Sequence, residues 1–221
     1  MTVAPFGEAG LLVHTASDER AQRLAADLRA SPVPGVLGAV PGRASVLVDL
    51  DPLVADPEGV ADELRSREAG LSDEPLVGRH RTIPVVYGGP MGPDLAEVAR
   101  MAGLDEAEVV ARHAGVTLRV LFGGFAPGFA YIGELPRELH VGRLETPRTR
   151  TPRGSVAVAD GMTGIYPTEL PGGWRVIGRT PVTLFDPTRE PPAYLVPGDR
   201  VRFVPIHEQE WEARAGRPAD W

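Results

Sequence analysis

Residues 123–131 read Gly-Gly-Phe-Ala-Pro-Gly-Phe-Ala-Tyr, which is the densest glycine-rich and aromatic-rich segment of the chain. Glycine permits backbone conformations that other residues rarely adopt, so the segment is expected to turn sharply. Its glycines lack the spacing of a dinucleotide-binding loop. Two interpretations stay open: the aromatic side chains plug a β-barrel, or they line a binding surface. The loop residues of interest are Gly124, Phe125, Pro127, Gly128, Phe129 and Tyr131.

The turn-forming composition of this segment extends along the whole chain. The 221 residues include 26 Gly and 23 Pro, whereas an average chain has roughly half that combined share. The excess has no period, which excludes a collagen-like repeat. Because Gly and Pro form tight turns at low steric cost, the composition indicates a turn-rich β architecture.

Two residue types are absent, and their absence excludes several kinds of chemistry. The chain has no Cys, which rules out disulfides, thiolate catalysis and Cys-based zinc sites. All 23 basic residues are Arg, so there is no Lys for a Walker A loop, a Schiff base or biotin attachment. The five histidines lack the spacing of a metal-binding pair, so we expect no metal.

Charge and hydropathy indicate whether the protein binds nucleic acid or a membrane and where in the cell it is expected. The formal net charge is −7, which argues against nucleic-acid binding through phosphates. No run of about 18 apolar residues is present, so we expect no membrane span. The N-terminal residues lack the pattern of a signal peptide. We therefore expect a cytoplasmic protein.

The first part of the chain alternates predicted strands and helices. Strands are expected at 11–14, 36–40 and 45–50, with a helix capped by Ser17 and a second helix opened by Pro57. The resulting order β-α-β-β-α indicates a small split βαβ sandwich. We place this α+β domain at residues 1–78.

The second domain, residues 79–221, is predicted to be mostly β with two helices near its start. A strand at 82–87 precedes a helix from Asp94, and Asp105 with Glu108 predicts a capping box for the next helix. Many short strands separated by turns favour a barrel or sandwich. Those strands are expected at 117–122, 155–159, 174–180, 182–185 and 200–206.

Several side chains in the second domain are candidates for binding or catalysis. His113 ends a predicted helix before a strand, where it either caps the helix or serves the site. Arg148 and Arg150 lie in a proline-flanked segment with Arg153. Guanidinium groups match carboxylates, so this segment either binds a small anion or is a solvated loop. Three further residues that could converge on the same surface are Tyr166, Trp174 and Arg179.

The motifs become specific when they are taken in order. They are Gly124–Tyr131, Pro147-Arg148, Gly154-Ser155-Val156, Gly164-Ile165-Tyr166-Pro167, Pro171-Gly172-Gly173-Trp174, Ile177-Gly178-Arg179-Thr180 and Pro197-Gly198-Asp199-Arg200-Val201. In this order and spacing they resemble the family of 5-oxoprolinase B subunits. That family is also called allophanate hydrolase subunit 1-like and includes the Kip inhibitor of a histidine kinase. The same module resembles carboxyltransferase domains C and D of urea carboxylases.

The resemblance implies a fold, partners and an activity. It implies an α+β N-terminal domain followed by a cyclophilin-like β-barrel. It also implies that the chain works with subunits A and C, which together open 5-oxoproline to glutamate with ATP. ATP would be used by the complex, and we expect neither a metal nor biotin on this chain. The chain alone is expected to be inactive because no ATP-binding motif is recognisable.

The motif positions suggest a role for each candidate residue. Arg148, Arg150 and Arg179 would hold anionic groups of the substrate. His113 would act as general acid or base, since the ordinary pKa of histidine lies near 6.5. Tyr166 and Trp174 would shape the pocket.

Two alternatives for the function stay open at this stage. One is a regulatory protein that binds a sensor histidine kinase through the barrel surface, as a Kip-type inhibitor would. The other is a carboxyltransferase-like module of urea or allophanate metabolism. In the second case biotin would have to arrive on another protein, because this chain has no Lys.

Overall fold

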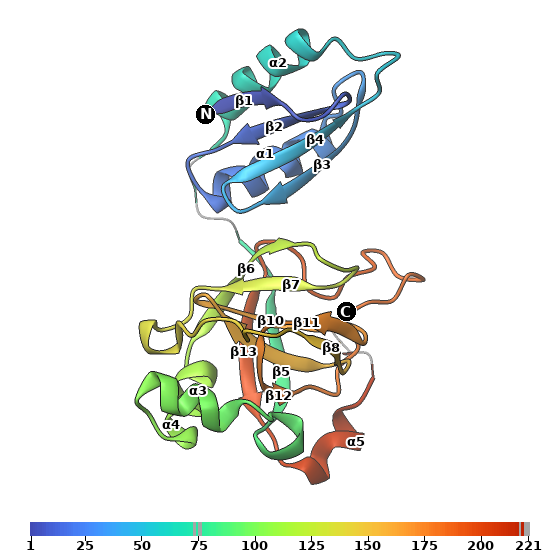
Figure 1. Ribbon diagram of the computed structural model, residues 1–221. Coiled ribbons are helices and arrows are strands. Elements are labelled where there is room, and N and C mark those ends of the chain that lie inside the picture. The colour runs from blue at the N-terminus through green and yellow to red at the C-terminus, as the bar shows by residue number, and fades with distance from the viewer. Residues whose placement is uncertain (73, 75–76, 217, 219–221) are drawn as a thin grey trace. The chain divides into compact units, whose positions relative to one another are not determined.

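The computed structural model describes residues 1–72, 74, 77–216 and 218, and the chain divides into two compact units, Met1–Val77 and Gly78–Trp221 (Figure 1). The first unit combines one sheet with two helices. Its elements are β1 (Thr2–Pro5), β2 (Gly10–His14), α1 (Asp18–Ala30), β3 (Val36–Gly42), β4 (Ser45–Leu50) and α2 (Pro57–Gly70).

The sheet of the first unit has the order β1-β2-β4-β3, and every neighbouring pair is antiparallel. Strands β2 and β3 therefore run in the same direction with β4 between them, and α1 connects them. This is a split βαβ arrangement. The edge strand β1 was not expected from the sequence. Apolar side chains of β2, β4, α1 and α2 form the core of this unit.

Local sequence signals explain both helices of the first unit. The Ser17 hydroxyl accepts the backbone N–H of Arg20 at 3.2 Å, which confirms the predicted N-cap of α1. The Asp56 carboxylate caps α2, and Pro57 occupies its first turn, where the missing N–H costs nothing. The apolar face of α1 is buried; it consists of Leu24, Ala25 and Leu28.

The second unit contains most of the strands. They are β5 (His80–Tyr87), β6 (Thr117–Gly123), β7 (Ala130–Gly133), β8 (Arg148–Thr151), β9 (Ser155–Ala159), β10 (Met162–Ile165), β11 (Leu170–Gly172), β12 (Arg175–Arg179) and β13 (Arg200–Pro205). The helices are α3 (Leu95–Ala102), α4 (Glu106–Ala114) and α5 (Trp211–Arg214), with single 3-10 turns at Gly89–Met91, Arg137–Leu139 and Glu208–Glu210.

Seven strands close into a barrel in the order β10-β7-β6-β13-β5-β12-β9, and β10 pairs with β9 to complete it. The pair β5–β13 is parallel and the other pairs are antiparallel, so the barrel is mixed. The predicted β-barrel is thus confirmed. The remaining strands, β8 and β11, form a separate two-stranded ribbon.

The strands of the second unit differ in several places from the sequence-based expectation. The predicted strand at 182–185 does not form; Val182 and Phe185 make only isolated bridges, to Gly216 and Ala193. Conversely, four short strands were not among those expected, namely β7, β8, β11 and β10. Strand β10 is the clearest case. All four of its residues are buried, so it lacks the polar–apolar alternation that reveals a half-exposed strand.

Helices α3 and α4 pack on the barrel against β12 and β13 (Figure 1). Gly103 ends α3 in the left-handed conformation, with φ of 67°, as glycine commonly does. The predicted capping box of α4 is present, because Asp105 and Glu108 exchange side-chain and backbone hydrogen bonds of 2.7 and 3.0 Å. No helix within the described residues is long and apolar enough to cross a membrane.

Candidate functional site

An aromatic cluster lies outside the barrel interior, in a hydrophobic cluster separate from the barrel core. The ring of Phe129 is buried and makes edge contacts with Tyr166 and Trp174, at centroid distances of 5.4 and 6.0 Å. Tyr131 contacts Trp174 at 5.6 Å. Gly164 makes room for this arrangement, since a Cβ there would lie 2.8 Å from Cζ of Phe129. The loop and the two later motifs therefore meet, as the sequence suggested.

The tip of the aromatic loop exposes Phe125. Its side chain is 59% exposed and its φ is 69°, which is uncommon for a bulky residue. Short hydrogen bonds hold the turn, from Ala126 N to the carbonyl of Gly124 at 2.8 Å and from Phe129 N to that of Ala126 at 3.0 Å. The loop is thus both a cover for the cluster and an exposed aromatic surface.

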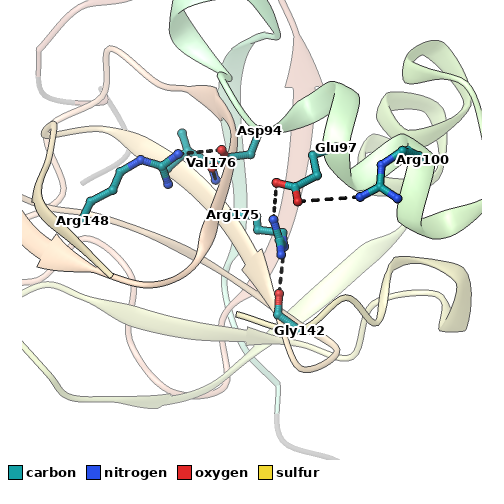
Figure 2. Close-up of polar contacts among 7 residues, drawn as sticks. All are labelled: Asp94, Glu97, Arg100, Gly142, Arg148, Arg175 and Val176. Atoms are coloured by element: carbon teal, nitrogen blue, oxygen red, sulfur yellow. Dashed lines mark hydrogen bonds and ion pairs between the residues drawn. The ribbon is translucent and has the colours of Figure 1, made fainter. Parts of the chain in front are cut away.

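Arg148 begins the ribbon strand β8 and is bound by a buried carboxylate. Its Nη2 donates to Oδ1 of Asp94 at 2.6 Å, as Figure 2 shows. The second oxygen, Oδ2, accepts the backbone N–H of Val176 at 2.6 Å, and the backbone N–H of Asp94 donates to the carbonyl of Val176 at 2.9 Å. One residue at the start of α3 therefore fixes both β12 and Arg148.

A second carboxylate, one helical turn later, holds a second arginine. Glu97 accepts a hydrogen bond from Nη1 of the buried Arg175, whose Nε donates to the carbonyl of Gly142 at 3.0 Å (Figure 2). Arg100 approaches the same carboxylate at 3.8 Å. Because Arg175 has these partners on two sides, it acts as a link between α3, β12 and the chain at Gly142.

His113 lies on α4 and is completely buried among the side chains of the barrel interior, 4.4 Å from the ring of Phe203. The hydroxyl of Thr163 donates to the carbonyl of Ala157 at 3.0 Å, so it accepts the proton of His113 Nε2, also at 3.0 Å. Nδ1 then accepts the hydroxyl of Tyr87 at 2.7 Å. The histidine is neutral, with one tautomer fixed by its partners.

Burial sets the ionisation of this interior group. Desolvation lowers the pKa of His113 to about 3, because a charged imidazolium is disfavoured away from water. Desolvation also raises the pKa of Tyr87. His113 does not share a hydrophobic cluster with Phe129, Tyr166 and Trp174. Its predicted acid–base role stays a prediction, and its surroundings favour a structural role.

The other two candidate arginines are placed differently from Arg148. Arg150 is 80% exposed and lies 3.6 Å from Glu169 at the surface. Arg179 ends β12, where its Nε donates to the carbonyl of Arg153 at 2.8 Å and its guanidinium lies 5.7 Å from the ring of Trp211. Within the described part of the chain, Arg179 and Arg148 share no hydrogen-bond or ion-pair partner. The structure thus does not gather the three arginines at one point.

The two tyrosines of the aromatic cluster have shifted ionisation. Burial raises the pKa of Tyr166, while a hydrogen bond from the Trp174 backbone opposes that shift. Burial likewise raises the pKa of Tyr131, opposed by the nearby charge of Arg143. Both phenols are therefore neutral at pH 7 and can donate hydrogen bonds.

Charge is distributed unevenly between the two units. Residues 1–77 contain 6 Arg and 13 Asp or Glu, whereas residues 78–221 contain 17 of each sign. The unit with the candidate site is thus neutral overall, so the negative net charge does not repel an anion from it locally. Among the described residues, no group of three His, Asp or Glu side chains could hold a metal ion.

Sequence reasoning missed Asp94, Glu97 and Arg175. Asp94 was expected to start a helix, although its side chain makes no capping bond. Its partners Arg148 and Val176 are 54 and 82 residues away. No local pattern could have revealed contacts of that separation.

Comparisons with known proteins agree with these motifs. Residues 1–195 match the family described as carboxyltransferase domain, subdomain C and D. The chain is 45% identical over 201 residues to the B subunit of 5-oxoprolinase from Escherichia coli O157:H7, with 89% of each chain covered. It is 38% identical over 200 residues to the B subunit of 5-oxoprolinase from Bacillus subtilis (strain 168), with 86% of this chain and 83% of that one covered.

A solved structure shares the fold. A crystal structure of the protein TTHA0988 matches with a TM-score of 0.79 at 37% identity. The match covers 90% of this chain but only 39% of that longer one, so the chain corresponds to less than half of that protein.

Proposed function

The chain belongs to the carboxyltransferase domain C and D family and is similar over most of its length to B subunits of 5-oxoprolinase. We therefore propose that it is the B subunit of an ATP-dependent 5-oxoprolinase. The complex would open the lactam ring of 5-oxoproline to give glutamate. The observation that carries the proposal is the 45% identity to the 5-oxoprolinase B subunit of E. coli O157:H7 over 89% of the chain. The aromatic cluster and the fixed Arg148 supply a surface suited to an anionic ring compound.

The reaction requires activation of an amide. Transfer of a phosphoryl group from ATP to the ring carbonyl oxygen would release ADP and activate the carbonyl carbon for attack by water. The ring C–N bond would then break with a proton passing to the nitrogen, and hydrolysis of the resulting acyl phosphate by a second water would release inorganic phosphate and glutamate. The chain has no Lys and hence no Walker A loop. We therefore assign ATP binding to another subunit and expect this chain to be inactive without subunits A and C.

The candidate residues would act on the non-reacting parts of the substrate. Arg148 would hold a carboxylate, and Tyr166 and Trp174 would bound the ring. Arg150 and Arg179 would add positive charge at a greater distance. Acid–base catalysis by His113 would require its buried network to open.

We also propose an assignment for the two units and for their location. The unit Met1–Val77 would be the predicted α+β domain and the unit Gly78–Trp221 the cyclophilin-like barrel domain. The predicted boundary, between residues 78 and 79, lies one residue after the boundary between the two units. We place the complex in the cytoplasm, where ATP is available. A barrel fold by itself does not imply prolyl isomerase activity.

The alternatives are less well supported. A Kip-type kinase inhibitor or a urea or allophanate module would each fit the family. The curated relatives from E. coli and B. subtilis, however, are named as 5-oxoprolinase subunits.

The test is reconstitution of the complex. Subunits A and C are purified with and without this chain, and glutamate release from 5-oxoproline is measured with and without ATP. We expect release only with all three chains and ATP. Full activity without this chain would refute the proposal, as would capture of a histidine kinase by the chain with no change in 5-oxoproline use.

A further inference from the structure

The ribbon of β8 and β11 contains a register shift that places two polar side chains on one face. Leu170 lies opposite Thr151 and Gly172 lies opposite Arg148, so two steps along β11 correspond to three along β8. The extra residue is a bulge in β8. In a regular strand, residues three apart point to opposite faces; the bulge brings Arg148 and Thr151 to the same face.

Both of these side chains have a buried polar atom that lacks a partner. Among the described residues, Nη1 of Arg148 and Oγ1 of Thr151 have no hydrogen bond, although each atom is shielded from water. Thr151 is completely buried, while the Arg148 side chain is 32% exposed. An unsatisfied buried polar group costs free energy, and an acceptor bound from outside the chain would offset that cost.

A third donor lies against the same face. The Tyr166 hydroxyl is so close to Gly172 that a Cβ on this glycine would overlap it. The backbone N–H of Trp174 donates to the Tyr166 oxygen, which leaves the hydroxyl proton free to donate. Gly172 lies opposite Arg148 across the ribbon, so the Tyr166 hydroxyl lies beside the ribbon position that pairs with Arg148.

The chemistry of the three groups indicates what they bind. A guanidinium N–H and two hydroxyls can all donate, and together they match the oxygens of a carboxylate. The nearest acid, Asp94, is already used by Arg148 and Val176. Leu170, on the same face, packs on the aromatic cluster and adds an apolar side. The set therefore suits a small carboxylate attached to an apolar ring.

We propose that this face of the β8–β11 ribbon, with Arg148, Thr151 and Tyr166, binds the carboxylate of a small cyclic carboxylic acid. On the proposed function, on which this identification rests, the ligand is 5-oxoproline bound by its carboxylate. Thr151 was not among the candidates suggested by the sequence. The ribbon, rather than the wider arginine-rich segment, would then determine substrate specificity.

The first test removes the charge from the protein and from the ligand in turn. The reconstituted complex is assayed with 5-oxoproline and with 2-pyrrolidinone, the same lactam without a carboxylate, as substrate or competitor. For Arg148→Ala we expect a KM for 5-oxoproline raised on the order of 10- to 100-fold, as for loss of a charge-assisted hydrogen bond. The inhibition constant of 2-pyrrolidinone should change less than about threefold, because it has no carboxylate for the guanidinium to hold. Equal effects on both compounds would overturn the proposal.

The second test separates binding from stability. Thr151→Val keeps the shape of the side chain and removes only the unpartnered hydroxyl. A merely structural hydroxyl would give a variant of equal or higher thermal stability with an unchanged KM. We expect higher thermal stability together with a KM for 5-oxoproline raised several-fold. An unchanged KM in a folded Thr151→Val variant would remove Thr151 from the site.

The controls keep this inference distinct from the proposed function. Arg65→Ala removes an exposed arginine from the first unit, paired at the surface with Asp62, and should leave both compounds unaffected. If the complex releases no glutamate at all, binding of 5-oxoproline and 2-pyrrolidinone to the full chain is measured by calorimetry. Binding of 5-oxoproline alone, lost in Arg148→Ala, would support the site although the proposed function fails. Absence of binding would refute the site.

Discussion

The barrel interior and the β8–β11 ribbon both bury polar side chains, but they differ in how completely these are hydrogen-bonded. In the interior, Tyr87, His113 and Thr163 form a chain of donors and acceptors that ends on a backbone carbonyl. On the ribbon, Arg148 and Thr151 each have an atom without a partner among the described residues. The interior chain of hydrogen bonds is complete within the protein, whereas the two ribbon atoms would gain a partner from the proposed ligand.

The difference separates residues that stabilise from residues that bind. A satisfied buried network makes a core unique and rigid, while an unsatisfied one destabilises the protein unless a ligand completes it. Residue type alone does not make this distinction, because histidine and arginine are both common in active sites. Substitutions in the two regions should therefore differ in their effects on stability and on binding.

Breaking the interior chain should have the largest effect. His113→Ala removes the acceptor of the Tyr87 hydroxyl and the donor to the Thr163 hydroxyl, and it opens a cavity beside Phe203. We expect the free energy of unfolding to fall by about 3–5 kcal/mol in urea denaturation. His14→Ala, at an exposed position, is the control and should change it by less than about 0.5 kcal/mol. Undiminished stability with lost turnover would make His113 catalytic instead.

Removing the support of the ribbon should have the next largest effect. Asp94→Ala leaves the Val176 N–H and Arg148 without their acceptor, a carboxylate whose side chain is only 8% exposed. We expect a loss of about 3 kcal/mol in the free energy of unfolding. Glu97→Ala, where the carboxylate is 42% exposed, should cost about 1 kcal/mol. If Asp94→Ala and Glu97→Ala lower the free energy of unfolding equally in chemical denaturation, the burial of the Asp94 carboxylate does not explain the loss.

Adding a methyl group at Gly172, on the β8–β11 ribbon, should have a moderate effect on stability and binding. Gly172→Ala forces the Tyr166 hydroxyl away from the ribbon. We expect thermal and chemical denaturation to show a loss of about 1–3 kcal/mol, with weaker binding of the carboxylate. Gly142→Ala is a matched control, since a Cβ there meets nothing within 4 Å. If both variants bind and unfold like the wild type, Tyr166 does not lie against the binding face.

The smallest expected effect, taken per pH unit, is the dependence of the free energy of unfolding on the ionisation of His113. The pKa of His113 is about 3 in the folded chain and near 6.5 when unfolded. The unfolded state therefore binds an extra proton between these values. Stability should be constant with respect to this group above about pH 6.5 and fall by about 1.4 kcal/mol per unit as pH decreases toward about 3.

Urea denaturation at a series of pH values measures this slope. A folded His113→Gln variant should lack the contribution, because glutamine does not titrate. If wild type and variant show the same slope between about pH 6 and about pH 4, the buried neutral state of His113 is not what sets the acid sensitivity.

Local sequence signals predicted much of the secondary structure. The Ser17 cap and the capping box of Asp105 and Glu108 each depend on residues within a few positions, and both are present. The many short strands and turns favoured a barrel or a sandwich, and the family resemblance implied the barrel. Strand β10 was missed because burial on both faces removes the alternation on which strand prediction depends.

The site was predictable only in part, for a physical reason. The motifs named Arg148, Tyr166 and Trp174, but whether an arginine is free or occupied depends on distant partners. Asp94 and the bulge in β8 determine how Arg148 is presented, and both arise from pairing across the fold. Arg179 has the same chemistry but lies against Trp211.

The pairing of the last barrel strand has a consequence for synthesis on the ribosome. Strand β13 lies between β5 and β6, although a long stretch of chain separates it from both in sequence. The unit Met1–Val77 can fold as soon as it leaves the exit tunnel, whereas the barrel has to wait for Arg200–Pro205. Until then the nascent chain exposes two unpaired strand edges, which are sites of aggregation and of chaperone binding.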